Sequence, residues 1–371
     1  MPPVSVMVKP VSGLCNMRCT YCFYADEMQN RETPLLPRMS EETLEYLIRR
    51  IFSYGDSSIS LAFQGGEPTL AGTTFYTRLL ELENQYNTRR IPVRHSMQTN
   101  GLYLSDSLLS VLKAGDFLVG VSLDGIKTIH DARRQDATGQ PTWDRVTANL
   151  RRLREAEIPY NILCVVDRWV AEKPEEVFTN LREHGYLQFI PHLDGLNGIP
   201  DADSLTAEAY GNFLIRTFRL YEKSFWEKKF VSVRTFDNWL NMLCGHPPES
   251  CGLSGRCSIS FLVEGDGSVY PCDFYALDHW RMGNLRTDSF FRMEKSTAAR
   301  EFIASSLPMD AACNACEWSF LCHGGCRRER EPFTDGIPRL NRLCEGLKAF
   351  FSACYPRMKE LSRRPPPPMP N

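Results

Sequence analysis

The stretch Leu14-Cys-Asn-Met-Arg-Cys-Thr-Tyr-Cys-Phe-Tyr24 decides how this chain of 371 residues is interpreted. It places Cys15, Cys19 and Cys22 on one short loop in a C-x3-C-x2-C pattern. Three thiolates can bind three irons of a [4Fe–4S] cube and leave the fourth iron open to another ligand. The apolar run Val4–Val8, just before the loop, is typical of a strand. The spacing therefore predicts an iron–sulfur cluster with one open iron.

A zinc knuckle is the alternative interpretation of these three cysteines. Zinc sites usually contain C-x2–4-C pairs and four ligands. After Cys22 the next Cys or His in the chain is His95, so this neighbourhood offers no fourth zinc ligand. We therefore favour the cluster.

The composition is that of an ordinary globular enzyme, apart from its cysteines. Hydrophobic residues make up 43%, charged residues 24%, and the formal net charge is −2, so we expect neither nucleic acid nor a membrane as partner. No apolar run approaches the ~18 residues of a membrane span, and the N-terminus lacks a signal-peptide pattern. Fourteen cysteines without an export signal indicate metal binding or catalysis in a reducing compartment. We expect a cytoplasmic protein.

From residue 4 to about residue 193, short β-like runs alternate with helical patterns. The predicted strands are Val4–Val8, Ser58–Phe63, Val93–Met97, Phe117–Ser122, Tyr160–Val166 and Leu187–Pro191. The predicted helices are Glu41–Ser53, Thr74–Asn87, Ser105–Lys113, Trp143–Glu155 and Pro174–His184. This repeat predicts an α/β fold with a parallel sheet, a partial (β/α)6 TIM-like barrel. The chemistry of such folds lies on loops at the carboxyl ends of the strands.

The rest of the chain has weaker periodicity. Residues 205–245 predict an amphipathic helix, and Phe261–Cys272 predict a hairpin whose turn is Gly265-Asp-Gly267. A further helix is predicted near Arg342–Ala353, and Arg363–Asn371 is a Pro-rich tail without a predicted function.

Polar motifs follow three of the predicted strands. In Gln64-Gly-Gly-Glu-Pro68 the glycines allow a ligand to approach the backbone, and the Glu67 carboxylate suits an ammonium group. Gln98-Thr-Asn-Gly101 and Ser122-Leu-Asp-Gly125 follow the next two strands. Each motif alone is more often an ordinary turn, but their recurrence at successive strand ends indicates one shared site.

Ten of the fourteen cysteines lie between Cys244 and Cys354 and mark a second, cysteine-rich region. Eight of them follow the pattern Cys251-x5-Cys257-x14-Cys272, then Cys313-x2-Cys316-x5-Cys322-x3-Cys326, and Cys344 after seventeen more residues. Two cubes with four thiolates each would use all eight. Two zinc ribbons would use the same number, and the spacing alone does not separate these alternatives. Cys164 is interpreted as a small buried hydrophobe, and no partner is predicted for Cys244 or Cys354.

The cysteine loop together with Gly65-Gly-Glu67 resembles the radical S-adenosylmethionine superfamily, and the downstream cysteines resemble the SPASM domain. The resemblance implies that the open iron binds S-adenosylmethionine and that the chain holds three [4Fe–4S] clusters. The implied domains are a radical S-adenosylmethionine partial barrel (1–200), a helical bridge (201–249), a cysteine-rich SPASM domain (250–350), and a C-terminal helix end with a disordered Pro-rich tail (351–371).

The same resemblance implies the site residues. The implied cofactor contacts are Tyr21, Gln64, Gly65, Gly66, Glu67, Ser122 and Arg133, of which Ser122 and Arg133 would hold the carboxylate or ribose. The implied cluster ligands are Cys15, Cys19 and Cys22 for the first cube, Cys251, Cys257, Cys272 and Cys326 for the second, and Cys313, Cys316, Cys322 and Cys344 for the third.

Over nearly its whole length the chain is similar to the anaerobic sulfatase-maturating enzymes. The similarity is carried by Met1-Pro-Pro-Val-Ser5, Cys22-Phe-Tyr24, Tyr270-Pro-Cys-Asp-Phe-Tyr275, Trp280-Arg-Met-Gly-Asn284 and Gly324-Gly-Cys-Arg-Arg328. It implies oxidation of a Cys or Ser in a sulfatase Cys/Ser-x-Pro-x-Arg motif to Cα-formylglycine, started by a 5′-deoxyadenosyl radical that abstracts a β-hydrogen. It implies Asp273 as the base and Tyr24, Gln98 and Asn100 as substrate contacts. The implied partners are an unfolded or nascent sulfatase segment and an electron donor such as flavodoxin or ferredoxin.

Two other functions stay open at this point. Another SPASM peptide maturase, for example one that forms thioether crosslinks, would share most of these motifs. Such enzymes often carry an N-terminal domain that binds a leader peptide, and with a first strand at residue 4 we expect no such domain here. A separately encoded recognition protein would keep this alternative open. A non-enzymatic iron–sulfur carrier would have no use for an open iron beside Gly65-Gly-Glu67. The sequence does not separate Cys from Ser as the target.

Overall fold

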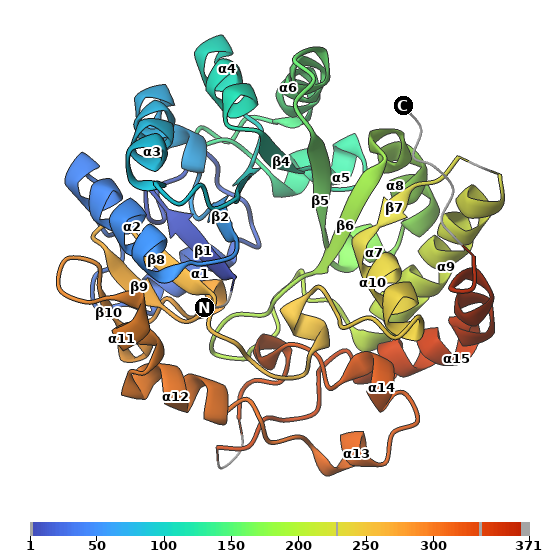
Figure 1. Cartoon of the computed structure of the whole chain (residues 1–371). Helices are drawn as coiled ribbons and strands as arrows, with labels where there is room; N and C mark the ends of the chain where they lie inside the picture. Colours follow the sequence, from blue (N-terminus) through green and yellow to red (C-terminus); the bar gives the residue numbers. More distant parts are fainter. Residues whose placement is uncertain (1–2, 228, 334–335, 365–371) are drawn as a thin grey trace. The chain divides into compact units, whose positions relative to one another are not determined.

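The computed structural model describes residues 3–227, 229–333 and 336–364 (Figure 1). The chain forms two compact units that interleave along the sequence: residues 1–122, 134–160 and 258–302 make the first, and residues 123–133, 161–257 and 303–371 the second. These units cut across the predicted domains, because part of the cysteine-rich region belongs with the first four strands. The four-part division stays a prediction, and residues 365–371 of the predicted tail lie outside the described residues.

The first unit is built on a sheet with the strand order β10-β9-β8-β1-β2-β3-β4. Strands β1 to β4 run parallel, β8 pairs in parallel with β1, and β8, β9 and β10 pair with one another antiparallel. The strands are β1 (Val4–Lys9), β2 (Ile59–Phe63), β3 (Val93–Thr99), β4 (Phe117–Ser122), β8 (Phe261–Glu264), β9 (Ser268–Tyr270) and β10 (Gly283–Asn284). The cluster loop leaves β1 at its carboxyl end.

Helices of the first unit cover this sheet, and α2, α3 and α4 follow one another beside β1 to β4 (Figure 1). The helices are α1 (Phe23–Gln29), α2 (Glu41–Tyr54), α3 (Thr73–Tyr86), α4 (Asp106–Ala114), α6 (Trp143–Glu155), α11 (Phe290–Glu294) and α12 (Thr297–Ala304). The last two residues of α12 belong to the second unit. The 3-10 turns are η1 (Pro68–Ala71), η4 (Asp273–Tyr275) and η5 (Asp278–Trp280). Ser40 caps α2 by accepting from Thr43 N at 3.1 Å. The rings of Phe63, Tyr76 and Phe117 pack edge to face or tilted in the core, with centroids 5.4 to 6.0 Å apart.

The second unit contains the parallel strands β5 (Tyr160–Val166), β6 (Tyr186–Pro191) and β7 (Ser232–Val233). Its helices are α5 (Lys127–Arg133), α7 (Arg168–Ala171), α8 (Pro174–Leu181), α9 (Ala207–Trp226), α10 (Arg234–Leu243), α13 (Ala311–Asn314), α14 (Ser319–Cys322) and α15 (Cys344–Leu361), with 3-10 turns η2 (Arg182–His184), η3 (Cys251–Leu253) and η6 (Arg327–Glu329). Phe218, Phe236, Trp239 and Phe350 form an aromatic core between α9, α10 and α15, with neighbouring rings 5.0 to 6.2 Å apart.

The six predicted strands and the predicted hairpin are confirmed, with strand ends shifted by at most two residues. The single helix predicted over residues 205–245 is wrong. Helix α9 ends at Trp226, and the segment around Ser232–Val233 pairs with β6 as β7 before α10 begins. The β-branched Val231 and Val233 are buried there, so tertiary pairing outweighs the helical pattern. The helix predicted at 342–353 is α15, which continues to Leu361.

Within the described residues, no helix is long and apolar enough to cross a membrane. The cytoplasmic location stays a prediction.

Candidate functional site

The three-cysteine loop lies between β1 and α1 in the first unit. Cys15, Cys19 and Cys22 are partly exposed and form no disulfide, and Cys22 is the N-cap residue of α1. The backbone N–H of Met17 points at Cys15 Sγ, at 3.4 Å. Hydrogen bonds from backbone N–H groups to thiolate sulfur are a common feature of cluster sites, so the loop fits the predicted cube.

The Gly-Gly-Glu motif packs directly on this loop. Gly65 and Gly66 have φ of 76° and 47°, and Glu67 N donates to Leu14 O at 2.8 Å. A Cβ on Gly66 would lie 2.2 Å from Leu14 O, so no larger residue fits without moving the loop backbone. The structure thus brings together two motifs that are about fifty residues apart in the sequence.

The Glu67 carboxylate has a different environment from the one expected. It is fully buried and accepts from Thr69 N at 3.0 Å, Thr99 Oγ1 at 2.7 Å and Asn100 N at 2.8 Å. Burial raises the pKa of Glu67, although these hydrogen bonds oppose the rise. These three hydrogen bonds join Glu67 to the neighbouring loops, and the predicted contact of Glu67 with the cofactor stays a proposal.

Asn100 and Arg134 reach the sulfur atoms of the cluster loop. Asn100 Nδ2 lies 2.8 Å from Asn16 Oδ1 and 3.7 Å from Cys15 Sγ. Arg134 Nη1 lies 3.7 Å from Cys19 Sγ, and its guanidinium lies over the ring of Tyr21 with 5.3 Å to the centroid. The sequence predictions missed Arg134, and no local pattern separates it from the neighbouring Arg133.

Two other predicted residues bond to each other. Gln98 Nε2, near the end of β3, donates to Ser122 Oγ at the end of β4, at 3.1 Å. Adjacent parallel strands place these two side chains on one edge of the sheet.

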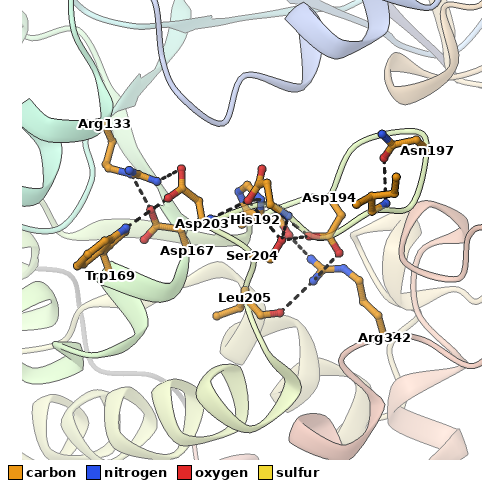
Figure 2. Close-up of polar contacts among 12 residues, drawn as sticks. Arg133, Asp167, Trp169, His192, Asp194, Asn197, Asp203, Ser204, Leu205 and Arg342 are labelled. Carbon is orange, nitrogen blue, oxygen red and sulfur yellow. Dashed lines mark hydrogen bonds and ion pairs between the residues drawn. The ribbon is translucent and has the colours of Figure 1, made fainter.

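Arg133 belongs to the second unit and pairs with carboxylates. Its Nε donates to Asp167 Oδ2 at 3.0 Å, and its guanidinium also pairs with Asp203 (Figure 2). Arg133 therefore holds the loop that follows β6 against the start of α7. On the far side of that loop, Arg342 pairs with Asp194 and donates to Leu205 O (Figure 2). The expected role of Arg133 in binding the cofactor receives no support from this environment.

Asp273 is a buried carboxylate of the first unit, on the 3-10 turn η4 directly after Cys272. Its Oδ2 accepts from Tyr24 OH at 2.8 Å and from Gln64 Nε2 at 2.5 Å. Its Oδ1 has no hydrogen-bond partner among the described residues. Burial raises the pKa of Asp273 to about 7, while the positive charge of Lys9 opposes the rise. Tyr24, Gln64 and Asp273, predicted separately, thus meet at one point.

The four cysteines predicted for the third cube line one pocket in the second unit. Cys313, Cys322 and Cys344 come from α13, α14 and the start of α15, and Cys316 lies between α13 and α14. Trp318, Phe351 and Lys348 also line the pocket. Burial raises the pKa of Cys322 to about 11. Four thiols around one mostly apolar pocket fit a saturated cube.

Three of the four cysteines predicted for the second cube lie together in the second unit. The Cys326 pKa is raised to about 12 by burial, and also by the nearby Cys251 and Cys257. The fourth, Cys272, belongs to the first unit, so this ligand set stays a prediction. Cys164 and Cys354 are buried in β5 and α15, whereas Cys244 is exposed with its Sγ 3.0 Å from Ser362 O.

Among the described residues, no three His, Cys, Asp or Glu side chains converge as ligands of a single metal ion. A cube attaches each thiolate to a different iron, so its ligands do not need to converge in that way.

Two family models match the chain. The Radical SAM superfamily matches residues 10–184, and SPASM, an iron–sulfur cluster-binding domain, matches residues 251–317. The second match favours the iron–sulfur interpretation of the cysteine-rich region over zinc.

Similar proteins extend over almost the whole chain. A cysteine-type anaerobic sulfatase-maturating enzyme from Clostridium novyi (strain NT) is 40% identical over 95% of both chains. Another from Clostridium perfringens (strain 13 / Type A) is 39% identical over 96% of this chain and 98% of the relative. A serine-type enzyme from Bacteroides thetaiotaomicron is 30% identical over 98% of this chain and 94% of the relative.

Solved structures give the same result. Native anSMEcpe with bound AdoMet and Cp18Cys peptide is 37% identical and has a TM-score of 0.93, over 98% of this chain and 99% of that chain. A second structure is Streptococcus suis SuiB bound to precursor peptide SuiA, which is 15% identical and has a TM-score of 0.65 over 92% of this chain and 76% of that chain. At this identity the similarity is one of fold alone. The cofactors are S-adenosylmethionine and iron–sulfur clusters. The chain belongs to the anaerobic sulfatase-maturating enzymes, with the α/β partial barrel of the radical S-adenosylmethionine superfamily and a C-terminal cysteine-rich SPASM domain.

Proposed function

We propose that this protein oxidises the cysteine of a Cys-x-Pro-x-Arg segment in a sulfatase to Cα-formylglycine. The observation that carries the proposal is the buried carboxylate of Asp273, held by Tyr24 and Gln64 beside the cluster loop in a chain of this family. Two donors fix Oδ2, and Oδ1 has no partner among the described residues, so one carboxylate oxygen is available to a substrate proton.

The cysteines fit three [4Fe–4S] clusters, which is the number we propose. Cys15, Cys19 and Cys22 would hold the first, Cys251, Cys257, Cys272 and Cys326 the second, and Cys313, Cys316, Cys322 and Cys344 the third. When bound, S-adenosylmethionine and these clusters supply the radical that removes a hydrogen atom from the target Cβ and accept the electron that the substrate then loses.

Asp273 acts on the proton of the target thiol. Once Cβ has lost a hydrogen atom, loss of one electron and of the thiol proton turns the C–S single bond into a C=S double bond. We assign the proton to Asp273 Oδ1, since Oδ2 is occupied by Tyr24 and Gln64. Water then replaces sulfur at this carbon and gives the aldehyde and hydrogen sulfide. A positioned base of this kind contributes about 10²–10⁴-fold in rate.

Arg134 takes the role that was expected of Arg133. Its guanidinium lies beside Cys19 Sγ and Tyr21, where it suits the carboxylate of S-adenosylmethionine, whereas Arg133 pairs with two aspartates. Arg134→Met should weaken binding of S-adenosylmethionine about tenfold or more in equilibrium dialysis. Arg133→Met is the matched control, and a larger loss in that variant would reverse the assignment.

The other predicted contacts stay proposals. Tyr21 lies on the cluster loop and Gly66 packs against it, so Tyr21, Gly65 and Gly66 suit the cofactor. Ser122, bonded to Gln98, suits either ligand. Asn100 is held by Asn16 and Cys15, which favours a role in positioning the cluster loop over direct contact with the peptide. The sulfatase segment and the electron donor are likewise proposals.

Cysteine is the proposed target because of the relatives. The cysteine-type enzymes are 38–40% identical to this chain and the serine-type enzymes 28–30%. The anSMEcpe structures with Cp18Cys and Kp18Cys peptides also belong to a protein 37% identical to this one.

Mass spectrometry of two synthetic peptides tests the proposal. Cys-x-Pro-x-Arg and Ser-x-Pro-x-Arg peptides are incubated anaerobically with reconstituted enzyme, S-adenosylmethionine and dithionite. We expect the Cys peptide to give an aldehyde that forms a hydrazone. Asp273→Asn should slow this product at least about 10²-fold while the cofactor is still cleaved, and the exposed Asp278→Asn should behave as wild type.

Two results would contradict the proposal. Cofactor cleavage with both peptides unchanged would favour another SPASM peptide maturase. A wild-type rate in Asp273→Asn would exclude Asp273 as the base and leave the reaction assignment in place.

A further inference from the structure

Four charged side chains form a closed set of ion pairs near Asp273, the proposed base. Lys9 Nζ lies 2.9 Å from Glu27 Oε2 and 2.9 Å from Glu264 Oε1. Arg31 Nη2 lies 3.0 Å from the same Glu27 oxygen and 2.8 Å from the same Glu264 oxygen. All four side chains are at most 2% exposed. Two cations and two carboxylates therefore alternate in a group without net charge, which we call the buried ion group.

The buried ion group joins separate elements of the first unit. Lys9 ends β1, Glu27 and Arg31 lie on and just after α1, and Glu264 ends β8. Lys9 and Glu264 are register partners in the parallel pairing of β1 with β8. The group thus connects the strand before the cluster loop, the helix after it and the first strand of the hairpin that precedes the turn carrying Asp273.

Glu27 connects this group to the turn that carries Asp273. Its second oxygen, Oε1, accepts from the backbone N–H of Ala276 at 2.7 Å. Ala276 is the C-cap residue of η4, three residues after Asp273. A buried carboxylate bonded to a backbone N–H fixes the position of that turn, because breaking the bond would leave a buried donor unpaired.

Lys9 connects the group to the other neighbours of Asp273. Its Nζ lies 4.7 Å from the ring centroid of Tyr24, the residue that donates to Asp273 Oδ2. Its aliphatic stem occupies the space beside Gly65, where a Cβ would lie 2.2 Å from Lys9 Cγ. Lys9 therefore packs against Tyr24, which bonds to Asp273, and against the loop after Gln64.

Stability alone is a poor reason for such a group. Desolvation of buried charges can exceed their mutual attraction, and well-packed apolar residues often replace buried ion pairs without loss of stability. Here Glu264 Oε2 and Arg31 Nε and Nη1 also lack hydrogen-bond partners among the described residues. The arrangement leaves polar atoms unsatisfied and at the same time gives each charged residue a fixed position.

We infer that Lys9, Glu27, Arg31 and Glu264 are positioning residues for Asp273, which hold η4 and Tyr24 so that Asp273 Oδ1 faces the substrate. This inference rests on the proposed function, because it takes Asp273 as the base. The four residues act through their neighbours and do not contact the reacting atoms.

Two variants test the inference. Glu27→Gln keeps the shape of the side chain and removes its charge. The double variant Lys9→Met/Glu264→Gln removes one positive and one negative charge and leaves the group neutral. Glu83→Gln is the control, since Glu83 is a buried carboxylate of the same unit that bonds to His95, away from this group.

Two measurements are made on each reconstituted enzyme. Hydrogen–deuterium exchange of the peptide around η4 should become about tenfold faster in both test variants and stay unchanged in the control. Formylglycine formed per 5′-deoxyadenosine should fall about tenfold in the test variants, while cofactor cleavage without peptide stays within about twofold of wild type.

The outcomes separate this inference from the proposed function. The inference is wrong if the test variants fold and show wild-type hydrogen exchange around η4 and a wild-type amount of formylglycine per 5′-deoxyadenosine. It is also wrong if neither variant folds. Either result would mean that the buried ion group serves stability alone. Asp273→Asn is measured beside them. Full coupling in that variant would refute the base, whereas faster exchange around η4 in the test variants would still support the positioning of the turn.

Discussion

Replacing Gly346 by alanine should remove one iron–sulfur cluster and leave the others in place. Gly346 lies two residues after Cys344, which begins α15 and lines the pocket proposed for the third cube. A Cβ on Gly346 would lie 1.9 Å from Ala207 O and 2.9 Å from Gly211 N, both backbone atoms of α9. No rotamer change relieves a contact between a Cβ and the backbone. Since real Cβ contacts essentially never fall below 3.0 Å, the two helices must separate by about 1 Å or more.

That displacement is large for a cluster ligand. Distances from ligand atoms to a metal are held to within about 0.2 Å, and Cys344 is part of the helix that has to move. Overpacking of this kind also costs about 1–3 kcal/mol of folding free energy. We therefore expect the variant to fold with a lower melting temperature and to lose the cube that uses Cys344.

Iron and acid-labile sulfide per chain measure this loss after anaerobic reconstitution. Gly346→Ala should contain about four iron and four sulfide fewer than wild type, and the electron paramagnetic resonance signal of the first cluster should still respond to S-adenosylmethionine. Ala349→Ser, on the exposed side of the same helix, is the control. A Gly346→Ala protein with full iron and sulfide content would refute the reasoning, because the strained contact would then be relieved without moving Cys344.

Three further substitutions test individual contacts of the first unit. Tyr24→Phe deletes one hydrogen-bond donor to Asp273 and should lower the amount of formylglycine formed per 5′-deoxyadenosine about tenfold, while cofactor cleavage is unchanged. Equal losses of formylglycine formation and of cofactor cleavage would contradict this. Glu67→Gln puts an amide NH2 against buried donors and should cost about 1–3 kcal/mol in urea unfolding. Burial lowers the pKa of His95, but the hydrogen bond and charge of Glu83 outweigh it and raise the pKa overall. The His95–Glu83 pair therefore contributes its full stability below about pH 6.5, and this contribution is lost as pH rises through the raised pKa of His95. The free energy of unfolding should accordingly fall between about pH 6 and about pH 9. In Glu83→Gln this fall should be smaller.

The sequence was sufficient wherever the information is local. The alternation of apolar runs with helical patterns located β1 to β6. The turn Gly265-Asp-Gly267 likewise predicted the β8–β9 hairpin. In each case a few neighbouring residues determine the structure, so tertiary contacts have little to change.

The direction of individual side chains could not be obtained in this way. Glu67 lies in the predicted loop, but its carboxylate turns inward because donors at Thr69, Thr99 and Asn100 converge on it. Arg133 and Arg134 are adjacent, and the end of α5 directs one to two aspartates and the other to the cluster loop. These outcomes depend on partners from other segments, which the local sequence does not specify.

The position of Asp273 is the clearest case of such dependence. Strand β9 runs antiparallel to β8, so the pairing register alone does not place the residues after β9 beside the loop that leaves β1. Contacts from α1 and from the loop after β2 do so: Tyr24 and Gln64 donate to Asp273, and Glu27 accepts from the turn that carries it. Helix α1 begins directly after Cys22. The seven-residue helix that follows the proposed cluster ligands thus also contacts the proposed base, 249 residues from Tyr24 along the chain. Helix α1 therefore links the proposed cluster loop to the proposed base, and a change in α1 should affect the coupling between hydrogen abstraction and proton removal before it affects either step alone.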